Sequence, residues 1–214
     1  MANTDRVNGF KPIGTLSGGM GSLGYIQRCL VDEDYAVALA VNDVVILATS
    51  NESNGMPTVA AAAAGNTPYG VIVGFENWDN GRDSSVTQTL EKPRISSAST
   101  RGYALVAISP DLIMETQIST GGDLEDGDIG SKADLVAGGA DATAQTSGME
   151  VNYSTMAATA TLVFHILEMV ERSDNALGAH AKVHVTFNIH ELGRGVYDGA
   201  ITAADVTGQL GVHA

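Results

Sequence analysis

The chain has 214 residues and a single cysteine, and its 25 acidic and 11 basic side chains give a formal net charge of −14 at pH 7. One cysteine excludes an intramolecular disulfide and a multi-cysteine zinc site, and the acidic balance argues against binding to nucleic acid, which needs clustered Lys and Arg. No apolar run reaches the roughly 18 residues of a membrane helix, and the N-terminus lacks the layout of a signal peptide. We therefore expect a protein that is made in the cytoplasm and binds neither nucleic acid nor a membrane.

Residues 1–24 predict an extended N-terminal arm. They contain Pro12 and six glycines, with few apolar residues between them. Such a segment is mobile alone and orders on contact with a partner. We expect its sparse apolar set to form contacts with a neighbouring subunit or a capsid: Phe10, Pro12, Ile13 and Leu16.

Residues 25–192 predict one β domain. Strands are expected at 25–31, 41–47 and 69–75, which are bounded by turn residues. Residues 58–64 predict a weak strand, because they are mostly an alanine run, for which a marginal helix is the alternative. The stretch 76–101 is polar and irregular, and predicts a loop-rich excursion from the domain.

Further strands are expected at 102–108, 112–118 and 133–136. The apolar run at 160–170 fits a strand or a helix, and its Thr, Val, Phe and Ile favour a strand. Residues 182–189 alternate cleanly, with Val183, Val185, Phe187 and Ile189 on one face. Residues 193–214 predict a C-terminal tail. The pattern as a whole predicts an all-β barrel or sandwich, jelly-roll or tulip-like, with long loops.

A glycine motif runs from Gly19 to Gly24 and matches G-x-G-x-x-G, with Asp43 about twenty residues further on. Dinucleotide binding requires a buried strand before this motif and a helix after it. Pro12 and Gly14 precede the glycines instead of such a strand. We therefore expect no bound dinucleotide and no cofactor.

Acidic residues surround Gly127, which raises the question of a calcium site. They are Asp123, Glu125, Asp126 and Asp128. An EF-hand loop would need ligands at the positions that Gly122 and Leu124 occupy, so that template fails. A solvated turn is the default interpretation, and an irregular calcium site is the alternative.

Three histidines, His180, His184 and His190, lie close together in the sequence, with His165 before them. Residues four apart on a strand are separated by roughly 13 Å, too far to bind one metal ion. We expect no metal site, and histidines on the surface or in an interface. The sequence also has none of the common catalytic motifs, which favours a protein that is not an enzyme.

Three blocks of sequence together resemble the capsid decoration (cement) proteins of tailed bacteriophages. The opening block is Met1-Ala2-Asn3-Thr4-Asp5-Arg6 with Asn8-Gly9-Phe10, Pro12 and Gly14; the second runs from Val41 to Phe75 and includes Ala64-Gly65-Asn66-Thr67-Pro68; the third is residues 160–170 with Arg172, Asp174-Asn175, Gly178, Ala181-Lys182, Asn188 and His190. Together the three blocks extend over about half of the sequence. Val7 and Ser173 replace an expected Pro, and Asn42-Asp43 replaces an expected Gly-Asp.

This resemblance implies a β-rich barrel that forms homo-oligomers, commonly trimers, on the major capsid protein at the outer surface of the virion, without catalysis. An acidic protein belongs on the outside of a particle that contains DNA. Two alternatives remain at this point: another virion component such as a tail-tube or head-fibre subunit, and a soluble ligand-binding or hydrolytic β domain.

Overall fold

The computed structural model describes residues 3–32, 35–48, 55–77, 102–141 and 146–193. Their regular structure is twelve β-strands and one short 3-10 helix (Asp126–Asp128), which confirms the all-β prediction. Within these ranges no helix is long and apolar enough to cross a membrane. Most of the predicted excursion at 76–101 and nearly all of the predicted C-terminal tail lie outside the described residues.

Five strands form a closed barrel. In the order of their pairing they are β3 (Ile26–Val31), β5 (Thr58–Ala61), β4 (Val44–Ala48), β6 (Gly70–Asn77) and β7 (Gly102–Ala107). The barrel has its own core, which includes Cys29, Val45, Ile72 and Val106. Burial raises the pKa of the Cys29 thiol to about 12, so this cysteine is a neutral core residue at pH 7.

The other seven strands form one sheet. Their order across it is β10 (Glu150–Ala157), β9 (Lys132–Val136), β11 (Phe164–Met169), β12 (Lys182–Phe187), β8 (Leu112–Gln117), β1 (Lys11–Thr15) and β2 (Gly19–Met20). A bridge between Ile118 and Val151 joins the end of β8 to β10, so the sheet curls back on itself. The predicted alternation of 183–189 is confirmed, because Val183, Val185 and Phe187 are fully buried.

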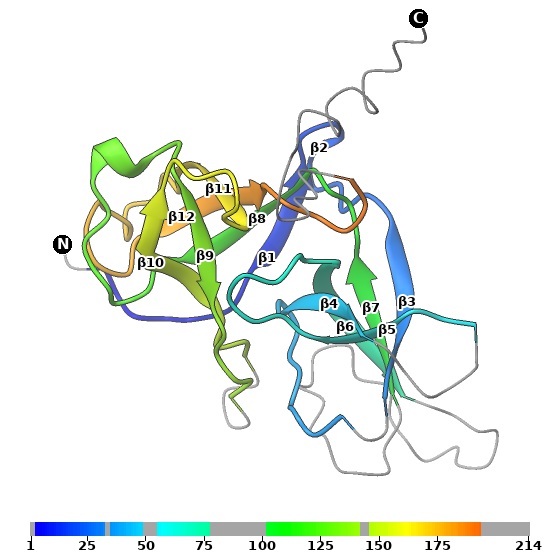
Figure 1. Cartoon of the computed structure of the whole chain (residues 1–214). Helices are drawn as coiled ribbons and strands as arrows, with labels where there is room; N and C mark the ends of the chain where they lie inside the picture. The colour runs from blue at the N-terminus through cyan, green and yellow to red at the C-terminus, as the bar shows by residue number, and fades with distance from the viewer. Residues whose placement is uncertain (1–2, 33–34, 49–54, 78–101, 142–145, 194–214) are drawn as a thin grey trace, which may run out of the picture.

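A second hydrophobic core joins the sheet to the barrel. Figure 1 shows the barrel beside the sheet, with β1 between them. The Phe10 ring stacks on Phe164 with centroids 4.4 Å apart, and Phe164 stacks on Phe187 at 5.7 Å. Val44 and Val71 of the barrel belong to the same buried cluster. The chain thus leaves the sheet after β2, forms the barrel and returns to the sheet in β8.

The predicted arm at 1–24 is extended over residues 3–10, but Lys11–Thr15 and Gly19–Met20 are strands of the sheet and not part of a free arm. β1 pairs with β8 along Lys11–Thr15 and with β2 on its other side. Pro12 lacks an N–H for the ladder, and the register of the β1–β8 pair shifts between Pro12 and Gly14. Composition alone could not reveal this pairing, because the partner strand lies about 100 residues away, beyond the whole barrel.

The four predicted interface residues consequently have different environments. Phe10 is fully buried within its own chain, so it cannot contact a neighbour. Pro12 and Ile13 are half-buried, and Leu16 is 49% exposed. Contact with a partner stays a prediction for Leu16 and, in part, for Pro12 and Ile13.

Asn42 occupies a backbone conformation that glycine favours, with φ +74°. Its side chain donates to Asn8 O at 3.0 Å, and its carbonyl accepts from Phe10 N–H at 2.9 Å. Asn tolerates this left-handed region better than other non-glycine residues. This explains how Asn42 can stand where the resemblance leads one to expect Gly.

Replacing Asn42 with alanine should therefore lower the free energy of unfolding by about 1–2 kcal/mol, because alanine combines backbone strain with the lost hydrogen bond. Asn42→Gly is the matched control, since it loses only the hydrogen bond and should cost less. Urea denaturation of both variants measures the difference. An alanine variant as stable as the glycine variant would contradict the role of backbone strain.

Candidate functional site

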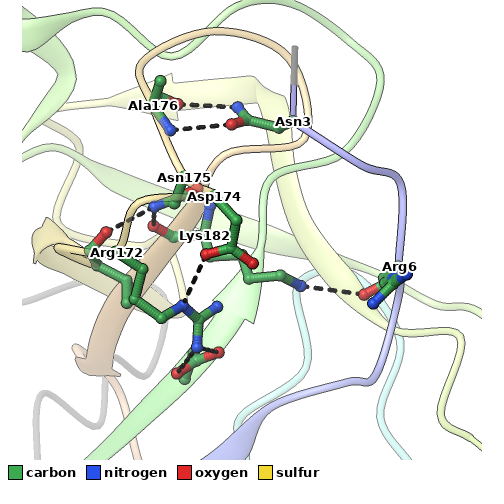
Figure 2. A network of polar contacts seen from close by, with 9 residues as sticks. Asn3, Arg6, Arg172, Asp174, Asn175, Ala176 and Lys182 are labelled. Atoms are coloured by element: carbon green, nitrogen blue, oxygen red, sulfur yellow. Dashed lines mark hydrogen bonds and ion pairs between the residues drawn. The ribbon is translucent and has the colours of Figure 1, made fainter. Parts of the chain in front are cut away.

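The N-terminal segment, defined as residues 3–9, is bound to the sheet through polar contacts. Figure 2 shows Asn3 paired with Ala176: the side-chain amide donates to the Ala176 carbonyl at 2.8 Å and accepts from the Ala176 N–H at 2.9 Å. The same amide nitrogen donates to Ala179 O at 2.8 Å. One asparagine side chain thus binds the loop before β12 much as a neighbouring strand would.

Both backbone groups of Arg6 are also held. Its N–H donates to Gln117 Oε1 at 2.9 Å, and its carbonyl accepts from Lys182 Nζ at 3.1 Å. Burial lowers the pKa of Lys182, and nearby Glu115 opposes that shift. The contact with Arg6 O gives a partly buried ammonium group one of the acceptors that it needs.

Gln117 is the centre of a cluster drawn from four separate parts of the chain. Its Nε2 lies 2.8 Å from Asp5 Oδ1, 2.9 Å from Glu150 Oε1 and 3.3 Å from His180 Nδ1. Gln117 is 2% exposed, whereas Asp5 is largely exposed. We call Asp5, Gln117, Glu150 and His180 the Gln117 cluster.

The Gln117 cluster holds the one set of three or more metal-type ligands found in the described ranges. The ligand atoms of Asp5, Glu150 and His180 all lie within 4.8 Å of one another, and sequence spacing gave no sign of them. Gln117 Nε2, however, lies within hydrogen-bonding distance of all three. The Arg6 N–H donates to Gln117 Oε1 and so fixes the orientation of the amide group, with Nε2 facing the three ligand residues. A cation would therefore have to displace the amide.

As it stands, the cluster is a hydrogen-bonded tether for the N-terminal segment. Burial raises the pKa of Glu150, and the hydrogen bond from Gln117 partly offsets that shift. Asp5 and His180 come within 3.7 Å of each other, so a protonated His180 would form an ion pair with Asp5. Two carboxylates share one amide donor here, and the cluster contains no Ser, Thr or Cys side chain.

Two depressions border the N-terminal segment. One of about 220 Å³ is lined by residues that include Thr4, Arg6 and His180, and one of about 100 Å³ is lined by residues that include Lys11 and Glu115. Both are smaller than the roughly 300–1,000 Å³ of typical small-molecule sites. The geometry around the segment therefore favours attachment of the chain over binding of a ligand.

The other histidines among the described residues have separate contacts. His184 Nδ1 lies 2.8 Å from Glu168 Oε1, His165 Nε2 lies 3.1 Å from Gly130 O, and the buried His190 ring packs 4.9 Å from Phe187. Neither His184 nor His190 joins the ligand set of the Gln117 cluster.

The other two sequence motifs form local structure. At the acidic turn, Glu125 N–H donates to Asp128 Oδ2 at 2.8 Å, which caps the 3-10 helix. The solvated turn stays the prediction for these residues, with an irregular calcium site as its alternative. The glycine motif begins in β2, continues through the connection after it and leads into strand β3, where a dinucleotide fold would have a helix.

Replacing Gln117 with leucine should lower the free energy of unfolding by about 1–3 kcal/mol, because the Arg6 N–H and two carboxylates lose their partner. Gln117→Glu is the informative comparison: it keeps the acceptor for Arg6 N–H but adds a third carboxylate. We expect it to be less stable than wild type at neutral pH and to recover as the pH falls. Thermal unfolding across pH measures both. A leucine variant as stable as wild type would show that the cluster does not hold the segment.

The fold and this cluster define an all-β protein in which a barrel and a curled sheet share a core and the N-terminal segment is fastened across the sheet. No protein-family model matches the sequence, and comparison with curated proteins and with solved structures likewise found no match.

Proposed function

We propose that this chain is a structural protein of a tailed bacteriophage, a decoration subunit that binds the major capsid protein on the outer surface of the head. The proposal takes its starting point from the sequence resemblance to cement proteins. Homo-oligomerisation and the absence of catalysis are parts of the same proposal.

The observation that carries the proposal is that the three blocks of resemblance meet in space. Asn3 of the first block binds Ala176 beside the third, and Phe10 stacks on Phe164. Asn42 lies within the second block, although the resemblance leads one to expect Gly there, and it binds Asn8 and Phe10 of the first block. The three blocks thus contact one another in the fold, as expected if they are parts of one structural unit, and this supports the proposal.

Contacts within the third block support the same view. The Asn175 side chain binds the N–H and the carbonyl of Lys182 and the carbonyl of Val170. The Asn188 amide donates to Ala160 O and Leu162 O at 2.8 and 2.7 Å. Each asparagine satisfies backbone groups at the end of a strand, and an aspartate or alanine could not replace all of these bonds.

The net charge of the chain supports a position on the outer surface of a capsid. A chain with net charge −14 is repelled by packaged DNA. Weak contacts suffice for attachment to a shell, because an oligomer that binds through several subunits gains affinity from each of them.

Particle fractionation tests the proposal. Phage particles should be separated into heads and tails on a density gradient, and the chain should be found by mass spectrometry in the head fraction. Purified protein added to heads that lack it should bind and raise the temperature at which they release DNA. Recovery in the tail fraction would favour a tail component, and recovery only in the soluble lysate would contradict a virion role.

A further inference from the structure

Exposed apolar side chains gather at the β1–β2 hairpin and the start of β3. Of the eight large hydrophobic residues that are exposed in the described ranges, four fall within residues 16–26: Leu16, Met20, Tyr25 and Ile26. Met20 and Tyr25 are the most exposed of them, at 69% and 66%. We call these four residues the hairpin face.

Backbone contacts place the hairpin face around one short connection between β7 and β8. Leu16 N–H donates to Asp111 O at 2.9 Å, and Ile108 N–H donates to Tyr25 O at 3.0 Å. Met20 lies opposite Gly14 in the hairpin. Ile26 pairs with Ala107 at the end of β7. The four residues therefore belong to one region of the surface, although they come from β2, β3 and the turns beside them.

This region is also an edge of the sheet. β2 is the last strand in the order, and among the residues with assigned structure it pairs only with β1. Exposed apolar residues at a sheet edge favour association with another chain unless charges oppose it. Figure 1 shows β2 projecting from the body of the molecule.

The distribution of acidic residues favours a second copy of this chain as the partner. Residues 6–31 contain Arg6, Lys11 and Arg28 and no acidic residue, so all 25 acidic side chains lie elsewhere in the sequence. Asp111 is the acid beside the face, and its carboxylate accepts hydrogen bonds from Ser17 N–H and the Ser109 hydroxyl. Two copies of a chain with net charge −14 repel each other through most of their surfaces. The hairpin face brings together apolar residues in a stretch without acidic side chains.

We propose that the hairpin face binds a second copy of this chain and forms the homo-oligomer contact. The inference rests on the proposed function in that it names the surface behind the expected oligomer. It also replaces the predicted contact through Phe10, which is buried, and keeps Leu16 from the same prediction.

Sedimentation velocity of the full chain over a range of concentrations tests this inference. The test variant carries Leu16→Ser with Met20→Ser, and the matched control carries Val37→Ser with Leu47→Ser, two similarly exposed residues of the barrel region. We expect wild type and control to associate alike, and the hairpin variant to need at least about tenfold more protein for the same oligomer fraction. Circular dichroism should show the same β spectrum for all three.

The inference is overturned if wild type is monomeric throughout, or if the hairpin variant associates as tightly as wild type. It is also overturned if the control loses association equally. Head binding is measured separately, so the two proposals fail independently. If the protein is monomeric and binds heads, the hairpin contact is rejected and the proposed function stands. If it forms the oligomer through the hairpin face and never binds heads, the proposed function is rejected and the hairpin contact stands.

Discussion

Replacing Phe10 with alanine should lower the free energy of unfolding by about 3–5 kcal/mol, the usual cost of deleting a buried aromatic ring. Phe10 is fully buried and stacks on Phe164, in the core that the sheet and barrel share. The loss should appear in urea denaturation as a lower midpoint. Because one core joins the two parts, we expect the sheet and the barrel to lose stability together.

Leu16→Ala is the matched control for Phe10→Ala. Leu16 is six residues away and half exposed, so its truncation should change stability by no more than about 0.5 kcal/mol. Deletion of residues 2–16, in contrast to Leu16→Ala, should unfold the sheet, because it removes β1 from between β8 and β2. A Phe10→Ala variant with wild-type stability and defective assembly would restore the arm interpretation.

Replacing Asp43 with asparagine should stabilise the protein by about 2–3 kcal/mol at pH 7.5 or above. Burial raises the pKa of Asp43 to about 6, and hydrogen bonds from Ser147 and the Ala40 N–H offset this only in part. Oδ2 accepts from the Ala40 N–H at 2.7 Å, while Oδ1 has no partner of normal hydrogen-bond geometry among the described residues. An asparagine keeps the acceptor for Ala40 and removes the buried charge.

The sign of the pH dependence follows from the raised pKa. In the unfolded chain Asp43 has the ordinary value of 3.8, so between about pH 4 and 6 the folded state holds a proton that the unfolded state has lost. The contribution of Asp43 to stability is fully present below pH 3.8 and is lost as the pH rises through 6. The difference between variant and wild type should therefore grow from near zero at pH 4 to its full value above pH 7.

Denaturant unfolding of both proteins at a series of pH values measures this difference and cancels the titration of the other carboxylates. Asp111→Asn is a suitable control, because hydrogen bonds from Ser109 and Ser17 lower the pKa of Asp111. Its substitution should destabilise the protein at neutral pH. A stability difference for Asp43→Asn that does not depend on pH would contradict a raised pKa of Asp43 in the folded protein.

The strands could be predicted from the sequence wherever a β-branched run or a clean alternation was present. Residues 69–75 and 182–189 contain β6 and β12 almost as expected. The strand expected at 41–47 begins at Val44, because Asn42 takes a left-handed turn that the apolar pattern does not reveal. β10 was missed, since its sequence EVNYSTMA is mostly polar and only Val151 is fully buried.

The Gln117 cluster could not be predicted from spacing. Asp5, Gln117, Glu150 and His180 are separated by at least thirty residues each. They meet because β8 lies between β1 and β12 and because the Ile118–Val151 bridge brings β10 to the end of β8. The pairing of β1 with β8 was hidden for the same reason: a whole barrel separates the two strands in the chain. Local composition carries no information about such contacts.

Cryo-electron microscopy of intact particles tests the central claim most directly. The account predicts density for a barrel joined to a curled sheet on the outside of the head shell, in contact with the major capsid protein, and with copies meeting through the β1–β2 hairpin. Density for this chain in the tail or inside the shell, or its absence from particles whose lysate contains it, would contradict the account.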